Sequence, residues 1–290
     1  MPFGLGSGPA ARVPAIVCFD MLPRGFSAIR IFPCGVDWIS EYLHLFQATS
    51  QLPALAASLP AGQARLRCSN VEASKQMSDP ATRLDAVLAD IDAANADDPR
   101  QVEADGVSRP FEIVYSERMS GRLAAMYPEA SELLRIAARA QHLRRFDIPR
   151  RSYPEGRAGY SDWRRACREH HARLVGEIMA RHGYAAEDIS RVGMLIRKEQ
   201  LKKDRDSQAL ENVVDVVFVE HYFDDFLFKY SGYDEDKIVD IVAKTLRKMS
   251  PKGHEAALAL DLPERTRRLI LAAAEREKDT LARLAATAVD

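Results

Sequence analysis

The sequence predicts an all-α protein, a bundle of several helices that follows a poorly patterned N-terminal extension. Apolar residues recur at helical spacing through most of the chain from residue 77 onward. One β-branched run, residues 213–219, continues unbroken into Glu220 and has no recognisable partner strand, so we interpret it as a central helix that is apolar on all sides. No stretch of about 18 apolar residues is present, which excludes a helix that crosses a membrane.

Prolines and glycines mark where the expected helices begin and end. Pro80, Pro110 and Pro128 suit the start of a helix, and Gly183 suits the residue just after one. A turn at Asp105-Gly106 has no recognisable strands on either side. Helices are expected over residues 84–95, 110–126, 130–142, 162–182, 189–196, 213–223, 238–249 and 263–289.

The chain divides into three parts. Residues 1–76 carry few charges and three of the four cysteines, and they show no sustained helical period. We interpret them as a poorly structured, dispensable extension; the alternatives are an organellar presequence and a true start at Met77, which would remove them from the mature protein. Residues 77–262 form the expected helical domain, and residues 263–290 form a C-terminal helix rich in Ala, Arg and Glu, with much of its surface facing solvent.

Composition narrows the classes of function. The net charge is −1 and the pI about 6.7, so no overall positive field favours nonspecific nucleic-acid binding, and any basic site must be local. The four cysteines lack C-x-x-C spacing, which is typical neither of a zinc site nor of a disulfide framework. We therefore expect a reducing compartment and predict a cytoplasmic protein with no membrane partner.

Residues 141–173 are the most informative segment for function. They hold nine arginines against four acids, interleaved with aromatic residues and bracketed by histidines. Arginine presents a rigid fork of donors that matches phosphate or carboxylate, and its plane stacks on aromatic rings. A cluster of this density between two helices predicts an anion-binding site.

Three residues in and beyond this segment could carry chemistry. His142 closes a helix of small residues, where a plain C-terminal helix cap is the competing explanation. His171 borders the apolar stripe of the next helix, a position that a core histidine would also occupy. Asp215 lies among valines, and because buried carboxylates are normally paired or bound to metal, a salt bridge to a loop arginine is the alternative.

A second anion site is expected at Ser250-Pro251-Lys252-Gly253-His254, where a helix begins. Amides at a helix N-terminus bind phosphate or carboxylate. With Lys248 and Met249, this segment faintly resembles the lysine-containing ATP loop of class I aminoacyl-tRNA synthetases. Neither a nucleotide-binding parallel sheet nor a companion histidine motif accompanies it, so we reject that interpretation.

Several separate motifs occur in order along the chain. They are Ala137–Pro149 (AARAQHLRRFDIP), Tyr153-Pro154, Arg157-x-Gly159-Tyr160, Trp163-Arg164, His171-Ala172 and Met249-Ser250-Pro251-x-Gly253-His254. Over residues 78–262 the chain resembles an uncharacterised helical family of bacteria and fungi, domain of unknown function 4202. The resemblance implies no established activity. Some members carry an automatic glutamyl-tRNA synthetase label, which the absence of that enzyme's catalytic domain argues against.

A further resemblance concerns mechanism. A helix that ends AAxxxH, a later helical histidine and an aspartate on a buried helix are similar to HD-type metal-dependent phosphohydrolases. That resemblance implies an HD-like bundle in which His142, His171 and Asp215 hold one or two divalent metal ions, which activate water against a phosphoester.

The sequence departs from the HD pattern at two places. Leu143 stands where the hallmark aspartate should follow the histidine. The earlier helical histidine is also missing, and only Glu112 or Glu117 could substitute for it. The fold could therefore be kept while the metal site has been lost or rebuilt around arginines.

These observations lead to three hypotheses. The first is an enzyme-like site for a phosphorylated small molecule or nucleotide, with His142, His171 and Asp215 as acid–base groups or metal ligands. The second is a non-catalytic module that binds RNA or a protein through the same basic and aromatic surface. In the third, the arginines neutralise internal carboxylates such as Asp215 and Glu220. The expected ligand-binding residues are Gln141, Arg144, Arg145, Arg150, Tyr153, Arg157, Tyr160, Trp163, Arg164, Ser250, Lys252 and His254.

Overall fold

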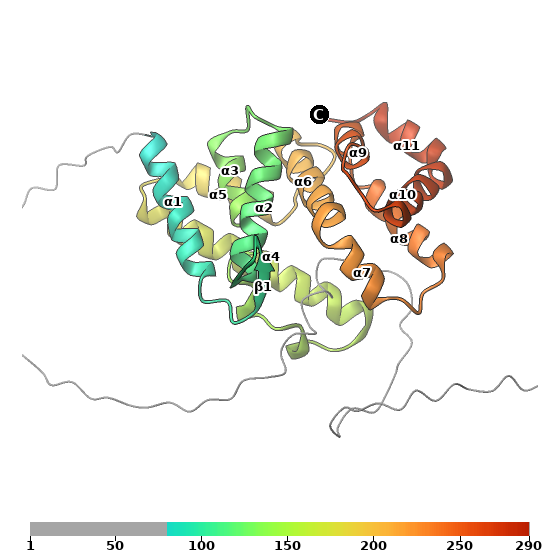
Figure 1. The fold of residues 1–290 in the computed structure, drawn as a ribbon. Helices are drawn as coiled ribbons and strands as arrows, with labels where there is room; N and C mark the ends of the chain where they lie inside the picture. The colour runs from blue at the N-terminus through green and yellow to red at the C-terminus, as the bar shows by residue number, and fades with distance from the viewer. Residues whose placement is uncertain (1–79, 290) are drawn as a thin grey trace, which may run out of the picture. The chain divides into compact units, whose positions relative to one another are not determined.

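The computed structural model describes residues 80–289 (Figure 1). The predictions for residues 1–76, including a start at Met77, lie outside these residues. All described residues belong to one compact unit. Within the described residues, every regular element except one small hairpin is a helix, so the predicted all-α, multi-helix class is confirmed.

The elements follow one another in a simple order. After the first helix comes the hairpin, then two helices, a stretch with two short 3-10 turns, and the remaining helices. The bounds are α1 Pro80–Asn95, β1 Gln101–Ala104, β2 Val107–Pro110, α2 Phe111–Met126, α3 Glu132–Arg139, η2 Arg145–Asp147, η3 Arg150–Ser152, α4 Gly156–Arg181, α5 Ala186–Ile196, α6 Arg205–His221, α7 Phe223–Lys229, α8 Glu235–Leu246, α9 Pro251–Leu258, α10 Glu264–Arg276 and α11 Lys278–Ala285.

α6 is the central helix of the bundle. It packs against α2 and α9, and also against α3 and α5. Every residue from Ser207 to Val219 is buried, including the whole β-branched run. Neighbouring helices cover every side of this segment, and such burial favours a helix even for a run with high strand propensity.

α4 is the longest described helix, and it packs against α5 and α1 (Figure 1). It begins at Gly156, six residues before the expected start at Asp162. It ends where the sequence predicted, because Gly183 follows with a φ of +75°, the left-handed conformation that glycine adopts at low cost.

The hairpin is the one element that sequence reasoning left without support. β1 and β2 pair antiparallel, with Gln101 opposite Pro110 and Ala104 opposite Val107. The two residues of the turn, Asp105 and Gly106, both have positive φ, as a type I′ turn in a two-residue hairpin loop requires. Each strand is only four residues long, too short for an alternating pattern to be recognised.

Further helix boundaries differ from expectation. α3 begins after Ser131, whose hydroxyl accepts the N–H of Leu134, and it ends at Arg139, three residues before His142. The expected C-terminal helix is interrupted at Glu277 and forms α10 and α11. α10 packs one face, which includes the buried Leu269, against α8, and its other residues are largely exposed. No helix in the described part of the chain is long and apolar enough to cross a membrane.

Candidate functional site

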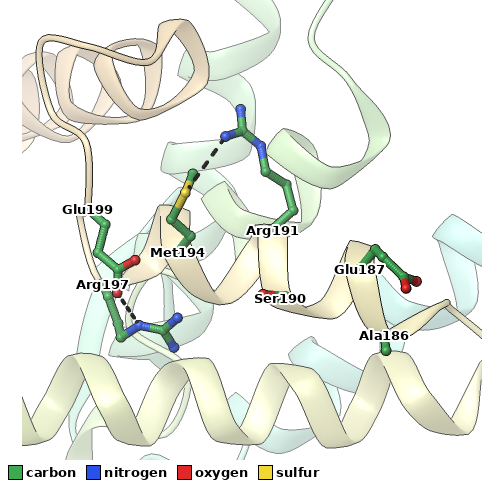
Figure 2. Close-up of a pocket in the computed structure, with 7 residues that line it drawn as sticks. All are labelled: Ala186, Glu187, Ser190, Arg191, Met194, Arg197 and Glu199. Atoms are coloured by element: carbon green, nitrogen blue, oxygen red, sulfur yellow. Dashed lines mark hydrogen bonds and ion pairs between the residues drawn. The ribbon is translucent and has the colours of Figure 1, made fainter.

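Two surface depressions of the described region contain none of the predicted site residues. The smaller, about 250 Å³, is lined by residues of α1, α2 and α3 and the turn that joins the last two. The larger, about 600 Å³, is open and follows α5 (Figure 2). Its arginines are bound to carboxylates, Arg191 to Asp204 and Asp206, and Arg197 to Glu199. Neither depression offers a set of converging catalytic groups.

The strongest candidate site lies in the interior. Ten polar side chains from α2, α4, α6 and the turns after α3, α5 and α8 are buried or half-buried, and each acts electrostatically on at least one other. We call this group the polar centre. Its members are Glu112, Tyr115, His142, Arg145, Arg164, His171, Lys198, Glu211, Asp215 and Lys248.

His142 lies in the turn after α3 and is not a cap on that helix. It is only 7% exposed, and its ring stacks on Tyr115 with the ring centroids 4.0 Å apart. Its Nδ1 is 3.5 Å from Oε2 of Glu112. Burial lowers the pKa of His142 well below its ordinary value, and the positive charges of Arg145 and Lys198 lower this pKa further. The imidazole is therefore neutral at neutral pH.

His171, on α4, lies beside His142 with the ring centroids 6.1 Å apart. Its Nδ1 is 2.7 Å from the carbonyl oxygen of Leu143. A carbonyl only accepts hydrogen bonds, so Nδ1 carries the proton and Nε2 keeps a lone pair. Burial lowers the pKa of His171 well below its ordinary value. Its Nε2 is buried and has no hydrogen-bond partner among the described residues.

A second part of the polar centre consists of two lysines and two carboxylates. Nζ of Lys248 donates to Oε1 of Glu211 at 2.9 Å and to Oδ1 of Asp215 at 2.8 Å. Nζ of Lys198 donates to the other oxygen of Glu211 at 2.7 Å. The second oxygen of Asp215 is buried and has no hydrogen-bond partner among the described residues.

The two carboxylates of α6 titrate in opposite directions. Burial and the neighbouring charge of Glu211 raise the pKa of Asp215 to about 6. Although burial opposes it, the charges of Lys198 and Lys248 hold the pKa of Glu211 well below its usual range. Glu211 is therefore the permanent counter-ion of the lysines, whereas Asp215 can carry a proton near neutral pH.

Charge connects the lysine group with the histidines. The positive charge of Lys198 lowers the pKa of His142. Burial is the main cause of the raised pKa of Tyr115, and the negative charge of Glu211 raises it further. On α4, burial and the charge of Arg168 lower the pKa of Arg164 to about 10. One continuous electrostatic centre therefore runs from the α3 turn through α4 to α6.

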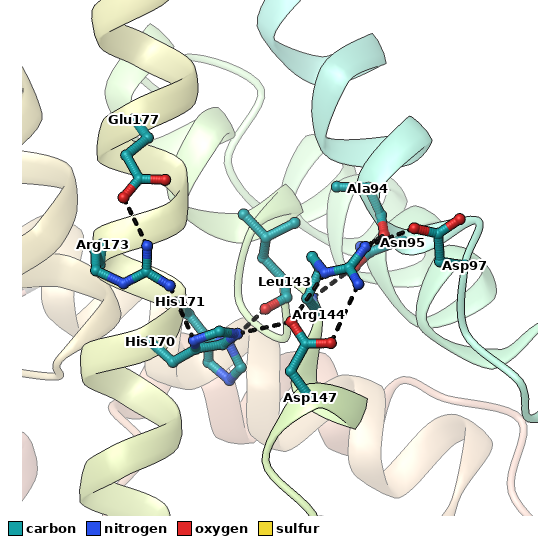
Figure 3. A network of polar contacts seen from close by, with 10 residues as sticks. All are labelled: Ala94, Asn95, Asp97, Leu143, Arg144, Asp147, His170, His171, Arg173 and Glu177. Atoms are coloured by element: carbon teal, nitrogen blue, oxygen red, sulfur yellow. Dashed lines mark hydrogen bonds and ion pairs between the residues drawn. The ribbon is translucent and has the colours of Figure 1, made fainter.

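Arg144 is used for bracing (Figure 3). Its backbone N–H donates to Oδ1 of Asn95 at 2.9 Å, and its guanidinium donates to the carbonyl of Ala94 and to the carboxylates of Asp97 and Asp147. The side chain thus ties the loop to the end of α1. For this arginine the geometry favours the bracing explanation over an anion clamp.

Figure 3 also shows how α4 holds the same loop. Nε2 of His170 is 3.2 Å from a carboxylate oxygen of Asp147. The adjacent His171 holds the Leu143 carbonyl, so two successive histidines fasten the loop at two points. The carboxylates of Asp215 and Glu220, which were predicted to pair with loop arginines, have other partners. Asp215 binds Lys248, and Glu220 binds Arg122.

The remaining arginines and aromatic residues of the segment pack together. Tyr160 and Trp163 are buried in a small cluster with Cys167, and Trp163 Nε1 donates to the carbonyl of Ile148. The guanidinium of Arg145 lies over the Trp163 ring, 4.6 Å from its centroid. Rings that are buried in this way cannot serve as an open stacking platform for single-stranded RNA.

The other predicted ligand-binding residues of this segment fall into three environments. Gln141 is buried beside His142, and its side-chain oxygen has no hydrogen-bond partner in the described region. Arg150 donates to the backbone carbonyl of the half-buried Tyr153. Arg157 is exposed on the first turn of α4. Only Gln141 of these lies next to the polar centre.

The expected anion site at the start of α9 is filled by the protein itself. The N–H of Ser250 donates to Oδ1 of Asn212, and the Ser250 hydroxyl accepts from Nδ2 of the same side chain. Nζ of Lys252 lies 4.1 Å from the ring centroid of Tyr127, and Nε2 of His254 is 2.7 Å from the Leu246 carbonyl oxygen. This segment therefore anchors α9 to α6.

A family model described as a domain of unknown function (DUF4202) matches residues 85–270, more than half of the chain. The chain belongs to this family. No curated protein and no solved structure matches it. This match confirms the predicted family, whereas the likeness to HD-type phosphohydrolases stays a prediction. All ten members of the polar centre lie within the matched residues.

The polar centre of this DUF4202 chain does not fit the divalent metal that the HD resemblance implies. Among residues 80–289, no group of three or more His, Cys, Asp or Glu side chains is placed to hold a metal ion. One oxygen of Asp215 is bound to the ammonium group of Lys248, and a cation would be repelled there. We therefore assign no chemical step to a metal.

Sequence reasoning missed several members of the polar centre. The sequence assigned no site role to Lys198, Glu211 or Lys248. The available signal was the placement of Glu211 one turn before Asp215 on an apolar helix, because two buried carboxylates require nearby cations. Which lysines supply them could not be predicted, since residues 198, 211 and 248 meet only in the folded chain.

Proposed function

We propose that this DUF4202 chain binds a phosphorylated small molecule or nucleotide at the polar centre, and that His142 and His171 exchange protons with it. The observation that carries this proposal is the pair of buried, neutral imidazoles surrounded by positive side chains. Neutral histidines are suited to act as general bases at physiological pH.

The charge of the polar centre supports an anionic ligand. The cations Arg145, Arg164, Lys198 and Lys248 outnumber its carboxylates Glu112, Glu211 and Asp215, and Glu112 is also shared with Arg100 outside the centre. Buried charges are costly unless they are compensated. A phosphate group would add negative charge beside these cations and accept hydrogen bonds from their donors.

His171 and Asp215 suit phosphoester hydrolysis, which is the reaction class that we propose. The lone pair on Nε2 of His171 can take a proton from a water molecule as it attacks phosphorus. Asp215, with a pKa of about 6, can supply a proton to the leaving oxygen. Both histidines are nearly buried, so a ligand would reach them only after surrounding side chains move.

Thermal denaturation with and without ligands tests the proposal. Inorganic phosphate, pyrophosphate and a panel of nucleotides should raise the melting temperature of the wild-type protein, and phosphate release should be followed in the same samples. His171→Gln should lose both effects. His182→Gln is the matched control, because His182 pairs with Asp90 away from the polar centre. If no phosphorylated compound stabilises the wild-type protein, the proposal is wrong.

A further inference from the structure

Glu112 lies between Arg100, to which it is hydrogen-bonded, and His142, which it approaches with its other carboxylate oxygen. Nη2 of Arg100 donates to Oε1 of Glu112 at 2.6 Å, and its Nε and Nη2 also bind both oxygens of Asp98, at 3.1 and 2.8 Å. The other oxygen of Glu112 is 3.5 Å from Nδ1 of His142. The side chains of Asp98 and Glu112 are fully buried.

The backbone holds the outer end of this chain in place. The N–H groups of Arg100 and Glu112 both donate to the Asp98 carboxylate, at 3.0 and 3.1 Å. Asp98 therefore accepts a hydrogen bond from an otherwise free N–H in the first turn of α2. The two backbone N–H groups hold the Asp98 carboxylate in the position in which it binds the Arg100 guanidinium. Because Arg100 lies between two carboxylates, the orientation of the Glu112 carboxylate follows from the backbone geometry.

The hydrogen-bonding capacity of these groups determines which proton lies between Glu112 and His142. An ionised carboxylate only accepts hydrogen bonds, and Arg100 already occupies one oxygen of Glu112. The remaining oxygen lies 3.5 Å from Nδ1 of His142, and neither atom has a hydrogen-bond partner among the described residues. If Nδ1 lacked a proton, its lone pair would face a carboxylate oxygen in a buried site, which is unfavourable.

We propose that Glu112, held by Arg100 and Asp98, is the positioning residue that keeps the proton of His142 on Nδ1 and leaves the lone pair on Nε2. The His142 ring is fixed in its plane by stacking on Tyr115, with an angle of 10° between the rings. His171 has the same tautomer for a different reason, the Leu143 carbonyl. Both histidines then present Nε2 as the basic nitrogen. Only the catalytic use of these nitrogens rests on the proposed function.

Nitrogen-15 NMR of the full-length protein at neutral pH tests the assignment directly. Long-range proton–nitrogen correlations distinguish the protonated ring nitrogen from the one with the lone pair, and the signals of His142 are identified by their loss in His142→Gln. We expect a protonated Nδ1 in the wild-type protein. A protonated Nε2, or a mixture of the two tautomers, overturns the proposal.

Glu112→Gln gives a sharper result. Arg100 only donates hydrogen bonds, so it should keep the amide oxygen of the new side chain and turn its NH₂ group toward His142. That group donates to Nδ1, so the proton should move to Nε2 and the tautomer should invert. Glu117→Gln is the matched control, because Glu117 lies on the same helix but binds Arg109 at the surface. An unchanged tautomer in Glu112→Gln overturns the role of Glu112.

Two safeguards keep the test decisive. If Glu112→Gln does not fold, Glu112→Asp replaces it, since a shorter carboxylate cannot reach both Arg100 and His142, and a mixture of tautomers is then expected. A pure Nδ1 tautomer in Glu112→Asp would count against the proposal. The tautomer is read without any ligand, so a failure of phosphate to raise the melting temperature would refute the proposed function and leave this inference standing.

Discussion

Gly253 and Asn212 lie so close together that a Cβ atom on Gly253 would stand 2.6 Å from the side-chain oxygen of Asn212. Asn212 is completely buried, and its amide makes four hydrogen bonds, with Tyr127, Gln208 and twice with Ser250. The amide cannot move aside without breaking these bonds. Glycine is therefore required where α9 begins and crosses α6.

Gly253→Ala is expected to destabilise the protein by about 1–3 kcal/mol, the usual cost of forcing extra atoms into a packed interior. Denaturation by urea would measure the change in the free energy of unfolding. Gly121→Ala is the control, because Gly121 is exposed on α2 with open space around it. That substitution should instead stabilise the helix by about 0.5–1 kcal/mol. Equal effects of the two substitutions would contradict the close contact.

Arg145→Ala should separate ligand binding from stability. If Arg145 serves as an anion site, its removal in the unliganded protein should cost about 2 kcal/mol, the loss of its cation–π contact with the Trp163 ring. Stabilisation by phosphate should disappear; in the wild-type protein it should reach about 2.7 kcal/mol at a hundred-fold excess over Kd. Arg100→Ala provides the contrast, because it leaves Asp98 and Glu112 buried without their cation and should cost about 3–5 kcal/mol. If Arg145→Ala lowered the stability of the unliganded protein as much as Arg100→Ala, Arg145 would be neutralising an internal carboxylate.

The stability of Asp215→Asn, measured relative to that of the wild-type protein, should be higher at pH 7 than at pH 4. The pKa of Asp215 is about 6 in the folded protein and 3.8 ordinarily, so the folded state favours the protonated form. The stability that this group contributes is present below pH 3.8 and is lost as the pH rises through about 6. Asparagine does not ionise, so the difference between the variant and the wild type should grow by roughly 2 kcal/mol over that range.

The control for Asp215→Asn is Glu220→Gln on the same helix. Glu220 pairs with Arg122 in a partly exposed site, and its substitution should produce no such rise with pH. Chemical denaturation at several pH values between 4 and 7 measures both variants. A difference for Asp215→Asn that does not change with pH would show that Asp215 is ionised throughout.

His171→Gln should make the protein less sensitive to acid. The pKa of His171 in the folded protein lies well below its ordinary value of 6.5, so below pH 6.5 the unfolded chain takes up a proton that the folded one does not. The stability from the neutral ring is present above pH 6.5 and is lost as the pH falls toward the folded pKa. In the variant, the slope of the free energy of unfolding against pH below pH 6.5 should be smaller by about 1.4 kcal/mol per pH unit. An unchanged slope would mean that His171 is charged in the folded protein.

The sequence alone determined the class of the fold and most of its helices. Apolar spacing placed the helix that ends before Gly183, and the absence of a partner strand correctly identified residues 213–219 as helical. These features depend on burial and on local backbone preferences, which a sequence displays directly. The hairpin at Asp105-Gly106 was left unsupported because its strands are short, and the break at Glu277 carries no proline or glycine to mark it.

The sequence also determined which residue types could form a site, and it placed His142, His171 and Asp215 among the candidates. Tertiary structure decided their partners. Arg144, which the sequence predicted to bind a ligand, is bound to two carboxylates, and Lys198, to which the sequence assigned no site role, binds Glu211 in the interior. A charged side chain has the same sequence signature whether it is solvated or buried. Its environment depends on which helices pack beside it, and that is set by the whole bundle.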